Sequence, residues 1–315
     1  MSLRELLVLL STSAVWGFHI VVIKTGVDVA PPIFYAALRM SLVAILLAPF
    51  LRWRPGRMGR VFAAGVCLGA LNYALMFTGI RLAPASASAI AIELYVPFAT
   101  ILSIVFLGEK VGWRRTLGIA LAFVGVAIVA LGRSGEGAGG ALAAFGVTLV
   151  AAAALTEAMG AIFVKQASGF RPHELLAWFA LFGAAALTAT SFALEDGQAA
   201  ALVSEDRLTL AGAVAFSALG ASIYAHTAYY WLLQRLPVSQ VAPSGLLTTV
   251  FAVASSVAFL GEPLTPLFLV GGLMAMIGVG IILIRSGKGA IVEPGAPEPV
   301  VLPPQPQRAE AEPRT

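Results

Sequence analysis

The chain has 315 residues, of which 59% are hydrophobic and only 11% are charged, and its mean hydropathy is +0.91. Soluble domains carry about 25% charged residues, so this composition excludes a soluble enzyme or binding domain and indicates an integral membrane protein. The formal net charge of +4 is better explained by Lys and Arg in the loops than by nucleic-acid binding, because no basic and aromatic patch lies outside the apolar runs.

Apolar runs of about 20 residues, the length that crosses a bilayer as a helix, recur along the whole sequence. The first run exceeds the length of a signal peptide and nine more follow it, so a cleaved leader on a soluble domain is excluded. The predicted spans are residues 3–24, 33–51, 61–80, 85–107, 113–132, 141–164, 173–194, 208–234, 238–260 and 265–284.

Residues 82–134 and 236–286 have similar sequences. Both follow an arginine, Arg81 or Arg235, and both end their first apolar run on Phe-Leu-Gly-Glu, at Glu109 or Glu262. Such similarity indicates an internal repeat. Because each half has five spans, the second half is inverted relative to the first, as in secondary transporters. The predicted fold class is an all-α integral membrane protein, with ten transmembrane helices in two inverted five-helix repeats around a central cavity.

This organisation divides the chain into repeats at residues 1–134 and 141–286, a Gly-rich linker at 135–140 and a disordered cytoplasmic tail at 287–315. The linker contains Gly135-x-Gly137-x-x-Gly140, which superficially matches a dinucleotide fingerprint. It follows a membrane helix instead of a strand, so no cofactor is expected.

The distribution of Lys and Arg in the loops predicts the orientation of the chain. An N-terminus in the cytoplasm leaves only Lys24, Arg81, Arg133 and Arg207 in outer loops, and both termini then lie inside a bacterial inner membrane. The inner loops carry Arg52, Arg54, Arg57, Arg60, Lys110, Arg114, Arg115, Lys165, Arg171 and Arg235.

Polar side chains within the spans are the candidate substrate-binding residues, because polar groups at membrane depth usually face a cavity or a partner. Each also has a structural alternative: a bond to a neighbouring helix, an ion pair or a place in the interfacial aromatic belt. The candidates are Trp16, His19, Asn72, Tyr73, Met76, Glu93, Glu157, Tyr224, His226, Tyr229, Ser244 and Thr248.

Helical periodicity separates some of these candidates from others. Tyr224 lies on a different face of span eight from His226 and Tyr229, so they do not all line one wall. Arg39 in span two needs an anionic or carbonyl partner, and a structural tether is its expected role. Spans five and ten contain several glycines but no buried charge, which predicts tightly packed scaffold helices.

Several of these features resemble the drug/metabolite transporter superfamily, EamA type. They are Trp16-Gly17 followed by Lys24, Arg39, the Ala-Ser-rich opening of span four, the run from Pro97 to Glu109 and their repetition. The resemblance implies secondary transport through a cavity lined by spans one, three, four, six, eight and nine. Within the superfamily the chain looks most like the YddG-type exporters of aromatic amino acids.

The second half departs from that pattern, because Glu157 stands where Trp16 maps and Phe179 where Arg39 maps. From the resemblance, the first functional hypothesis is an exporter of aromatic and other neutral amino acids that works by alternating access. Nucleosides, cationic drugs and other metabolites stay open as substrates. Intramembrane acids permit proton coupling without requiring it.

An intramembrane enzyme is the rival from another class, and its motifs are incomplete. His173-Glu174 is followed by Ala177 where a zinc protease needs its second histidine. Ser244-Gly245 is preceded by Ala242 where a rhomboid-type protease needs glycine. No enzymatic activity is expected. A purely structural scaffold would be undercut by stabilisation with a ligand.

Overall fold

The computed structural model describes residues 1–107, 111–134, 138–167, 169–233, 235–236, 238–241 and 244–285, and it is helical with no strand in these ranges. The expected tail at 287–315 and Glu109 lie outside the described residues. So do residues 135–137 of the predicted linker, while residues 138–140 already belong to a helix.

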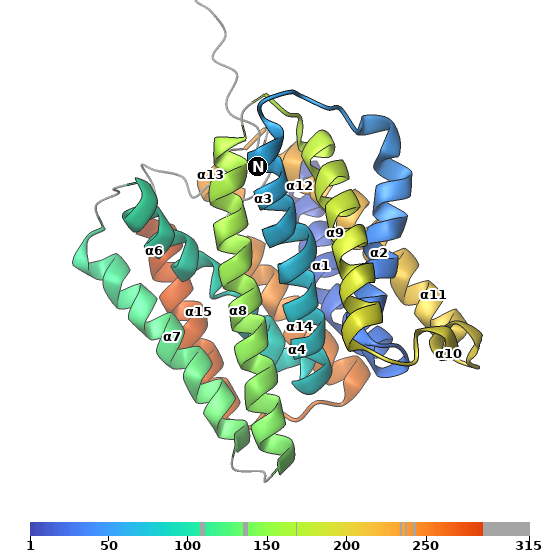
Figure 1. Cartoon of the computed structure of the whole chain (residues 1–315). Helices are drawn as coiled ribbons and strands as arrows, with labels where there is room; N and C mark the ends of the chain where they lie inside the picture. The colour runs from blue at the N-terminus through green and yellow to red at the C-terminus, as the bar shows by residue number, and fades with distance from the viewer. Residues whose placement is uncertain are drawn as a thin grey trace, which may run out of the picture.

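The helices follow one another in a single bundle (Figure 1). In chain order they are α1 (Leu3–Val29), α2 (Pro32–Leu47), η1 (Ala48–Phe50), α3 (Met58–Gly65), η2 (Val66–Leu71), α4 (Asn72–Leu82), α5 (Ala85–Ile92), α6 (Tyr95–Leu107), α7 (Trp113–Ser134), α8 (Ala138–Gln166), α9 (Pro172–Leu194), α10 (Gln198–Val203), α11 (Arg207–Ala215), η3 (Phe216–Tyr224), α12 (Ala225–Leu233), α13 (Val238–Val241), α14 (Ser244–Leu260) and α15 (Pro266–Arg285).

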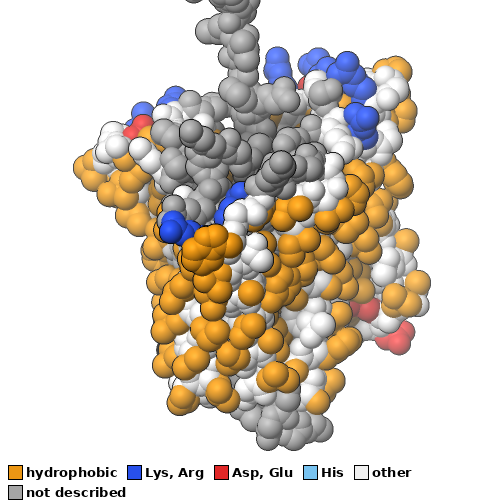
Figure 2. Space-filling view, turned by 90° about the vertical axis from the view of Figure 1, so that its left-hand side faces the viewer, with side chains coloured by type: hydrophobic (Ala, Val, Ile, Leu, Met, Phe, Trp, Pro, Cys, Tyr) orange, Lys and Arg blue, Asp and Glu red, His pale blue; other side chains and the backbone are white. Residues whose placement is uncertain are grey.

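The predicted spans are found in the structure. Within the described part of the chain, nine continuous helical stretches are long and apolar enough to cross a membrane, and α14 is a shorter apolar helix. Figure 2 shows apolar side chains over most of the visible body, with Lys and Arg gathered toward its upper end. This surface suits a lipid environment, where helices satisfy their own backbone groups, and it identifies a multi-pass membrane protein.

Capping side chains, some local and some from the other half of the chain, account for where several helices begin. Ser2 and Glu5 form a capping box at the start of α1. Two carboxylates cap helices of the other half: Glu195 accepts the N–H groups of Ile33 and Phe34 at 2.8 and 2.9 Å. Glu262 accepts those of Ala85 and Ser86 at 2.6 and 2.9 Å. The Glu of the second Phe-Leu-Gly-Glu motif therefore caps a helix of the first half.

The contacts between helices repeat in the two halves. Helix α1 packs on η3, α12 and α14, while α8 packs on η2, α4, α5 and α6. When each helix is matched with its equivalent in the other half, the contacts of α1 correspond to those of α8. The equivalent helices α2 and α9 are in contact with each other, and so are α7 and α15. The pairing fits two inverted five-helix repeats.

Glycines allow close backbone approach between α7 and α15, as the sequence predicted for scaffold helices. A Cβ atom built on Gly125 would lie 2.5 Å from the Gly271 carbonyl oxygen, and one on Gly271 would lie 2.6 Å from the Gly125 oxygen. Gly118 and Gly278 approach each other in the same reciprocal way. Such small-residue contacts are typical of membrane helix pairs.

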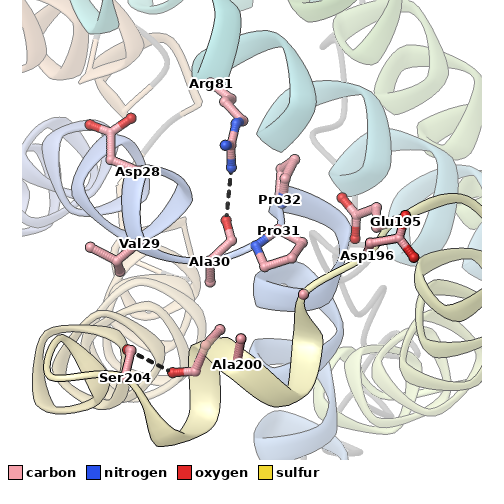
Figure 3. A pocket seen from close by; sticks show the side chains of 12 residues that line it. Asp28, Val29, Ala30, Pro31, Pro32, Arg81, Glu195, Asp196, Ala200 and Ser204 are labelled. Atoms are coloured by element: carbon pink, nitrogen blue, oxygen red, sulfur yellow. Dashed lines mark hydrogen bonds between the residues drawn. The ribbon is translucent and has the colours of Figure 1, made fainter.

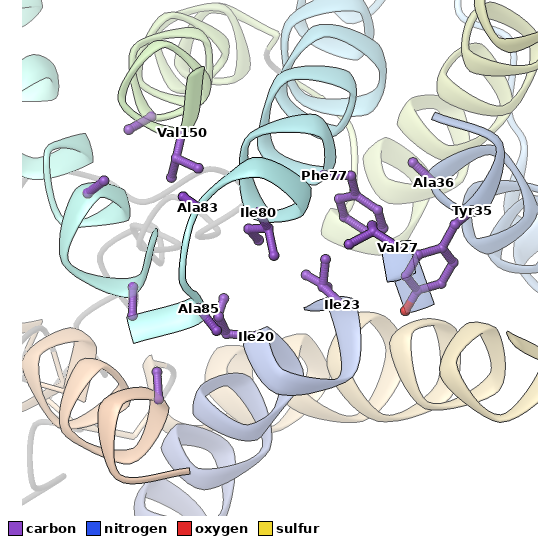
Figure 4. Close-up of a cluster of buried hydrophobic side chains, with 14 of the residues drawn as sticks. Ile20, Ile23, Val27, Tyr35, Ala36, Phe77, Ile80, Ala83, Ala85 and Val150 are labelled. Carbon is purple, nitrogen blue, oxygen red and sulfur yellow. The ribbon is translucent and has the colours of Figure 1, made fainter. Parts of the chain in front are cut away.

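The main core runs through much of the bundle, and one dense part of it lies where α1, α2 and α4 meet (Figure 4). Ile23, Tyr35, Phe77 and Ile80 are fully buried there. Gly26 leaves room for the Tyr35 ring, because a Cβ atom at Gly26 would lie 2.8 Å from its Cζ atom. This core holds α2 against α4, which carries the candidate site residues Asn72, Tyr73 and Met76.

Candidate functional site

Two spans at equivalent places in the halves contain a π-helix, η2 in the third span and η3 in the eighth. Such wide turns are rare and often occur at functional sites. Each one immediately precedes predicted site residues, Asn72 and Tyr73 after η2 and His226 and Tyr229 after η3. Helical periodicity alone had not indicated either π-helix.

Trp16, His226 and Tyr229 form an aromatic cluster between α1 and α12. The Trp16 ring lies 5.3 Å from the His226 ring, edge to face, and 5.4 Å from the Tyr229 ring. Both Trp16 Nε1 and His226 Nδ1 lie within hydrogen-bond distance of the Ala221 carbonyl oxygen, at 3.1 and 2.9 Å. Because that oxygen only accepts, each nitrogen donates, and the π-helix thus fixes the orientation of both rings.

Asn72 and Glu157 form the corresponding contact between α4 and α8. Asn72 Nδ2 donates to the Ala153 carbonyl oxygen at 2.9 Å and lies 3.5 Å from Glu157 Oε2. Glu157 is the residue that maps onto Trp16 across the repeat, so a carboxylate and an amide occupy the place that aromatic rings occupy in the other half. Met76, one turn beyond Asn72, is half-buried against the main core.

A serine network joins the first half to η3, and we define it as Ser217 and Ser222 with His19, Tyr35 and Arg39. Ser217 Oγ lies 2.9 Å from His19 Nε2 and 2.7 Å from the Tyr35 hydroxyl. Ser222 Oγ donates to the Ser217 carbonyl oxygen at 3.0 Å. It accepts from Arg39 Nε and Nη2 at 3.3 and 3.0 Å. His19, predicted from the sequence, therefore lies in a buried contact between helices.

Arg39 also contacts Tyr73, another predicted residue. Its guanidinium lies over the Tyr73 ring at 4.4 Å from the centroid, a favourable cation–π arrangement. Arg39 thus links α2 to η3 through Ser222 and to α4 through Tyr73, as expected of a tether.

Glu93 interrupts the fourth span, since α5 ends at Ile92 and α6 begins at Tyr95. Its carboxylate accepts a hydrogen bond of 2.5 Å from the Thr249 hydroxyl of α14. Ser244 is buried in the same helix, and its carbonyl oxygen accepts from Ser13 Oγ at 3.3 Å. Thr248 bonds that carbonyl oxygen at 3.0 Å.

Tyr224 is set apart from these groups. It is 45% exposed, and its hydroxyl lies 2.8 Å from Ser11 Oγ. This agrees with its placement on a different helical face from His226 and Tyr229. Helical periodicity did not predict that Ser217, Ser222 and Thr249 are the partners of His19, Arg39 and Glu93. The five-residue spacing of the two serines does match one turn of a π-helix.

A surface pocket of about 470 Å³ lies at the turn between α1 and α2, beside α10 (Figure 3). Arg81 crosses this region and donates to the Val27 and Ala30 carbonyl oxygens at 2.7 and 3.2 Å. Glu195 also lines it, but its carboxylate caps α2. None of the predicted site residues lines this pocket, so it is separate from the mid-span groups.

A bundle of inverted halves with polar and aromatic groups near the middle of its spans defines a membrane transporter. The model of the EamA-like transporter family matches residues 3–131 and 144–284, one stretch in each half, and the chain belongs to this family. The sequence-based recognition of an EamA-type drug/metabolite transporter is thereby confirmed, as is the expectation that the protein is not an enzyme.

Similar proteins include a "Probable amino-acid metabolite efflux pump" of Escherichia coli, 31% identical over 89% of this chain and 95% of the relative. The protein of that name from Salmonella typhimurium is 30% identical, with the same two shares. A "Probable terminal-alkyne amino-acid exporter" of Streptantibioticus cattleyicolor is 28% identical over 64% of this chain and 65% of the relative. One crystal structure, at 17% identity, shares the fold with a TM-score of 0.58, covering 92% of this chain and 100% of that one.

Proposed function

We propose that this transporter exports amino acids, aromatic and other neutral ones, by alternating access between its halves. One observation carries the proposal. Equivalent places in the two halves hold an aromatic cluster around Trp16 and a polar contact between Asn72 and Glu157. An aromatic amino acid has the same two parts, an apolar ring and a charged ammonium group.

In this proposal the aromatic cluster and Met76 bind the apolar side chain of the substrate. Glu157, with Asn72, binds the ammonium group, because a carboxylate is the natural partner of a cation at membrane depth. We assign Tyr73 and Glu93 to the same binding site. Ser244, Thr248 and His19 support it, while Tyr224 contributes where its face opens to the surface.

The names of the similar proteins support amino acids as the substrate class. The loop arginines favour a bacterial inner membrane with both termini in the cytoplasm. Transport from the end that carries Arg52 and Arg54 toward the end that carries Glu195 is then export. Glu93 and Glu157 permit coupling to protons, and facilitated efflux needs none.

The test is uptake of labelled tryptophan, phenylalanine and threonine into liposomes that contain the purified protein, with and without an imposed pH gradient. We expect saturable entry that is absent from empty liposomes. Stimulation by the gradient would show proton coupling. Entry of nucleosides or cationic dyes with no entry of any amino acid would overturn the proposal.

Matched carboxamide variants sharpen this test. Glu157→Gln removes the acid beside Asn72, and Glu205→Gln alters an exposed acid in the loop before α11. Loss of one charged hydrogen bond corresponds to an increase in KM of about tenfold or more. We expect that increase for Glu157→Gln alone. Equal kinetics in both variants would remove Glu157 from the binding site.

A further inference from the structure

Arg39 is a buried cation whose charge is only partly matched. Its side chain lies near the middle of α2, and the residue is 2% exposed. Nε and Nη2 donate to Ser222, but Nη1 is buried and has no hydrogen-bond partner. Among the described residues, no Asp or Glu forms an ion pair with it.

A guanidinium at membrane depth without an acid is costly, because the bilayer does not hydrate it. The Tyr73 ring and the Ser222 hydroxyl offset part of this cost. Neither supplies a negative charge. The planar fork of an arginine matches the geometry of a carboxylate or a phosphate, to which it donates parallel charge-assisted hydrogen bonds. Of these two anions, an amino acid carries the carboxylate.

We propose that Arg39 binds the carboxylate of the transported substrate through Nη1, which makes this transporter selective for free acids over their amides or amines. The inference rests on the proposed function and deepens it. Asn72 and Tyr73 are neighbours in the first turn of α4. The Tyr73 ring lies under the Arg39 guanidinium, and Asn72 contacts Glu157. A zwitterion would find a cation and an acid on the two sides of that turn.

Nη1 is closed off from solvent in this conformation. The carboxylate therefore reaches it when the helices separate on one side of the membrane during the transport cycle. In this conformation Ser222 Oγ accepts from the guanidinium, and it donates to the Ser217 carbonyl oxygen within η3.

The competing explanation is that Arg39 serves only as a tether between α2 and η3. Three substitutions separate the explanations. Ser222→Ala removes the hydroxyl that accepts from Arg39 but leaves the guanidinium charge. Arg39→Gln removes the charge, and Arg39→Lys keeps it but loses the fork.

The experiment is counterflow of labelled phenylalanine in liposomes, with unlabelled phenylalanine or phenylalaninamide as competitor. In the wild-type protein we expect the amide to compete at least about tenfold more weakly than the acid, as loss of a charged hydrogen bond predicts. Arg39→Gln should bind acid and amide equally. Ser222→Ala should lower the Tm yet keep the tenfold preference, and Arg39→Lys should keep part of it.

Equal competition by acid and amide in the wild-type protein would overturn the inference while leaving amino acid transport intact. So would a preference that survives in Arg39→Gln. Absence of any amino acid counterflow would instead reject the proposed function. If Arg39→Gln fails to fold, stabilisation of the wild-type protein by each compound still decides, because a carboxylate site requires a larger Tm rise with phenylalanine than with the amide.

Discussion

The α7–α15 interface and the contact between α2 and η3 both join the two halves of the bundle, but they use opposite chemistry. In the first, Gly125 and Gly271 bring two backbones into direct contact. In the second, Arg39 of α2 bonds to the Ser222 hydroxyl of η3, and His19 of α1 joins the same serine network through Ser217.

The difference shows what each interface can contribute. Helices in lipid gain little from the hydrophobic effect, so close van der Waals packing has to hold a permanent contact. Hydrogen bonds between hydroxyls and a cation can exchange partners, including a substrate. We therefore expect α7 and α15 to stay packed while the serine network rearranges during transport.

The largest stability effect should come from Gly125→Ala. The new methyl group would lie 2.5 Å from the Gly271 carbonyl oxygen, so α7 and α15 would have to separate. Overpacking of this kind costs about 1–3 kcal/mol, and thermal unfolding in detergent should show a lower Tm with an unchanged KM. Gly139→Ala is the control, because a Cβ atom there meets nothing within 4 Å. Equal Tm values for the two variants would contradict the packing argument.

A smaller effect is expected from Ser217→Ala. The substitution leaves His19 Nε2 without its hydroxyl partner, and the Tyr35 hydroxyl keeps only its bond to the Ala213 carbonyl oxygen. The free energy of unfolding should fall by about 1–2 kcal/mol, near the upper values for polar contacts in membranes.

Transport separates this variant from the glycine variant. If the serine network rearranges during the cycle, Ser217→Ala should change the transport rate as well as the Tm. Ser41→Ala, a half-buried position on α2, is the control for loss of a hydroxyl. A normal rate in Ser217→Ala would show that the network is as static as the α7–α15 interface.

The comparison also shows what could be predicted from the sequence. The spans and the glycine packing of α7 and α15 follow from composition and repetition, which act along one helix at a time. The partners of Arg39 and His19 do not, because Ser217 and Ser222 meet them through a π-helix that shifts the helical faces. The sequence placed Glu157 and Trp16 at equivalent positions, but only the fold shows that Asn72 and His226 face them.

The smallest effect that still tests the comparison is Trp16→Phe. This change keeps an aromatic ring beside His226 but removes the Nε1 donor to the Ala221 carbonyl oxygen. A single polar contact between membrane helices contributes about 0.6 kcal/mol, so the Tm should fall only slightly. If the ring binds substrate, phenylalanine transport should persist with a moderately higher KM. Trp113→Phe, at a 71% exposed position, should change neither value. A large loss of stability in Trp16→Phe would show that the indole holds α1 to η3 as firmly as glycine packing holds α7 to α15.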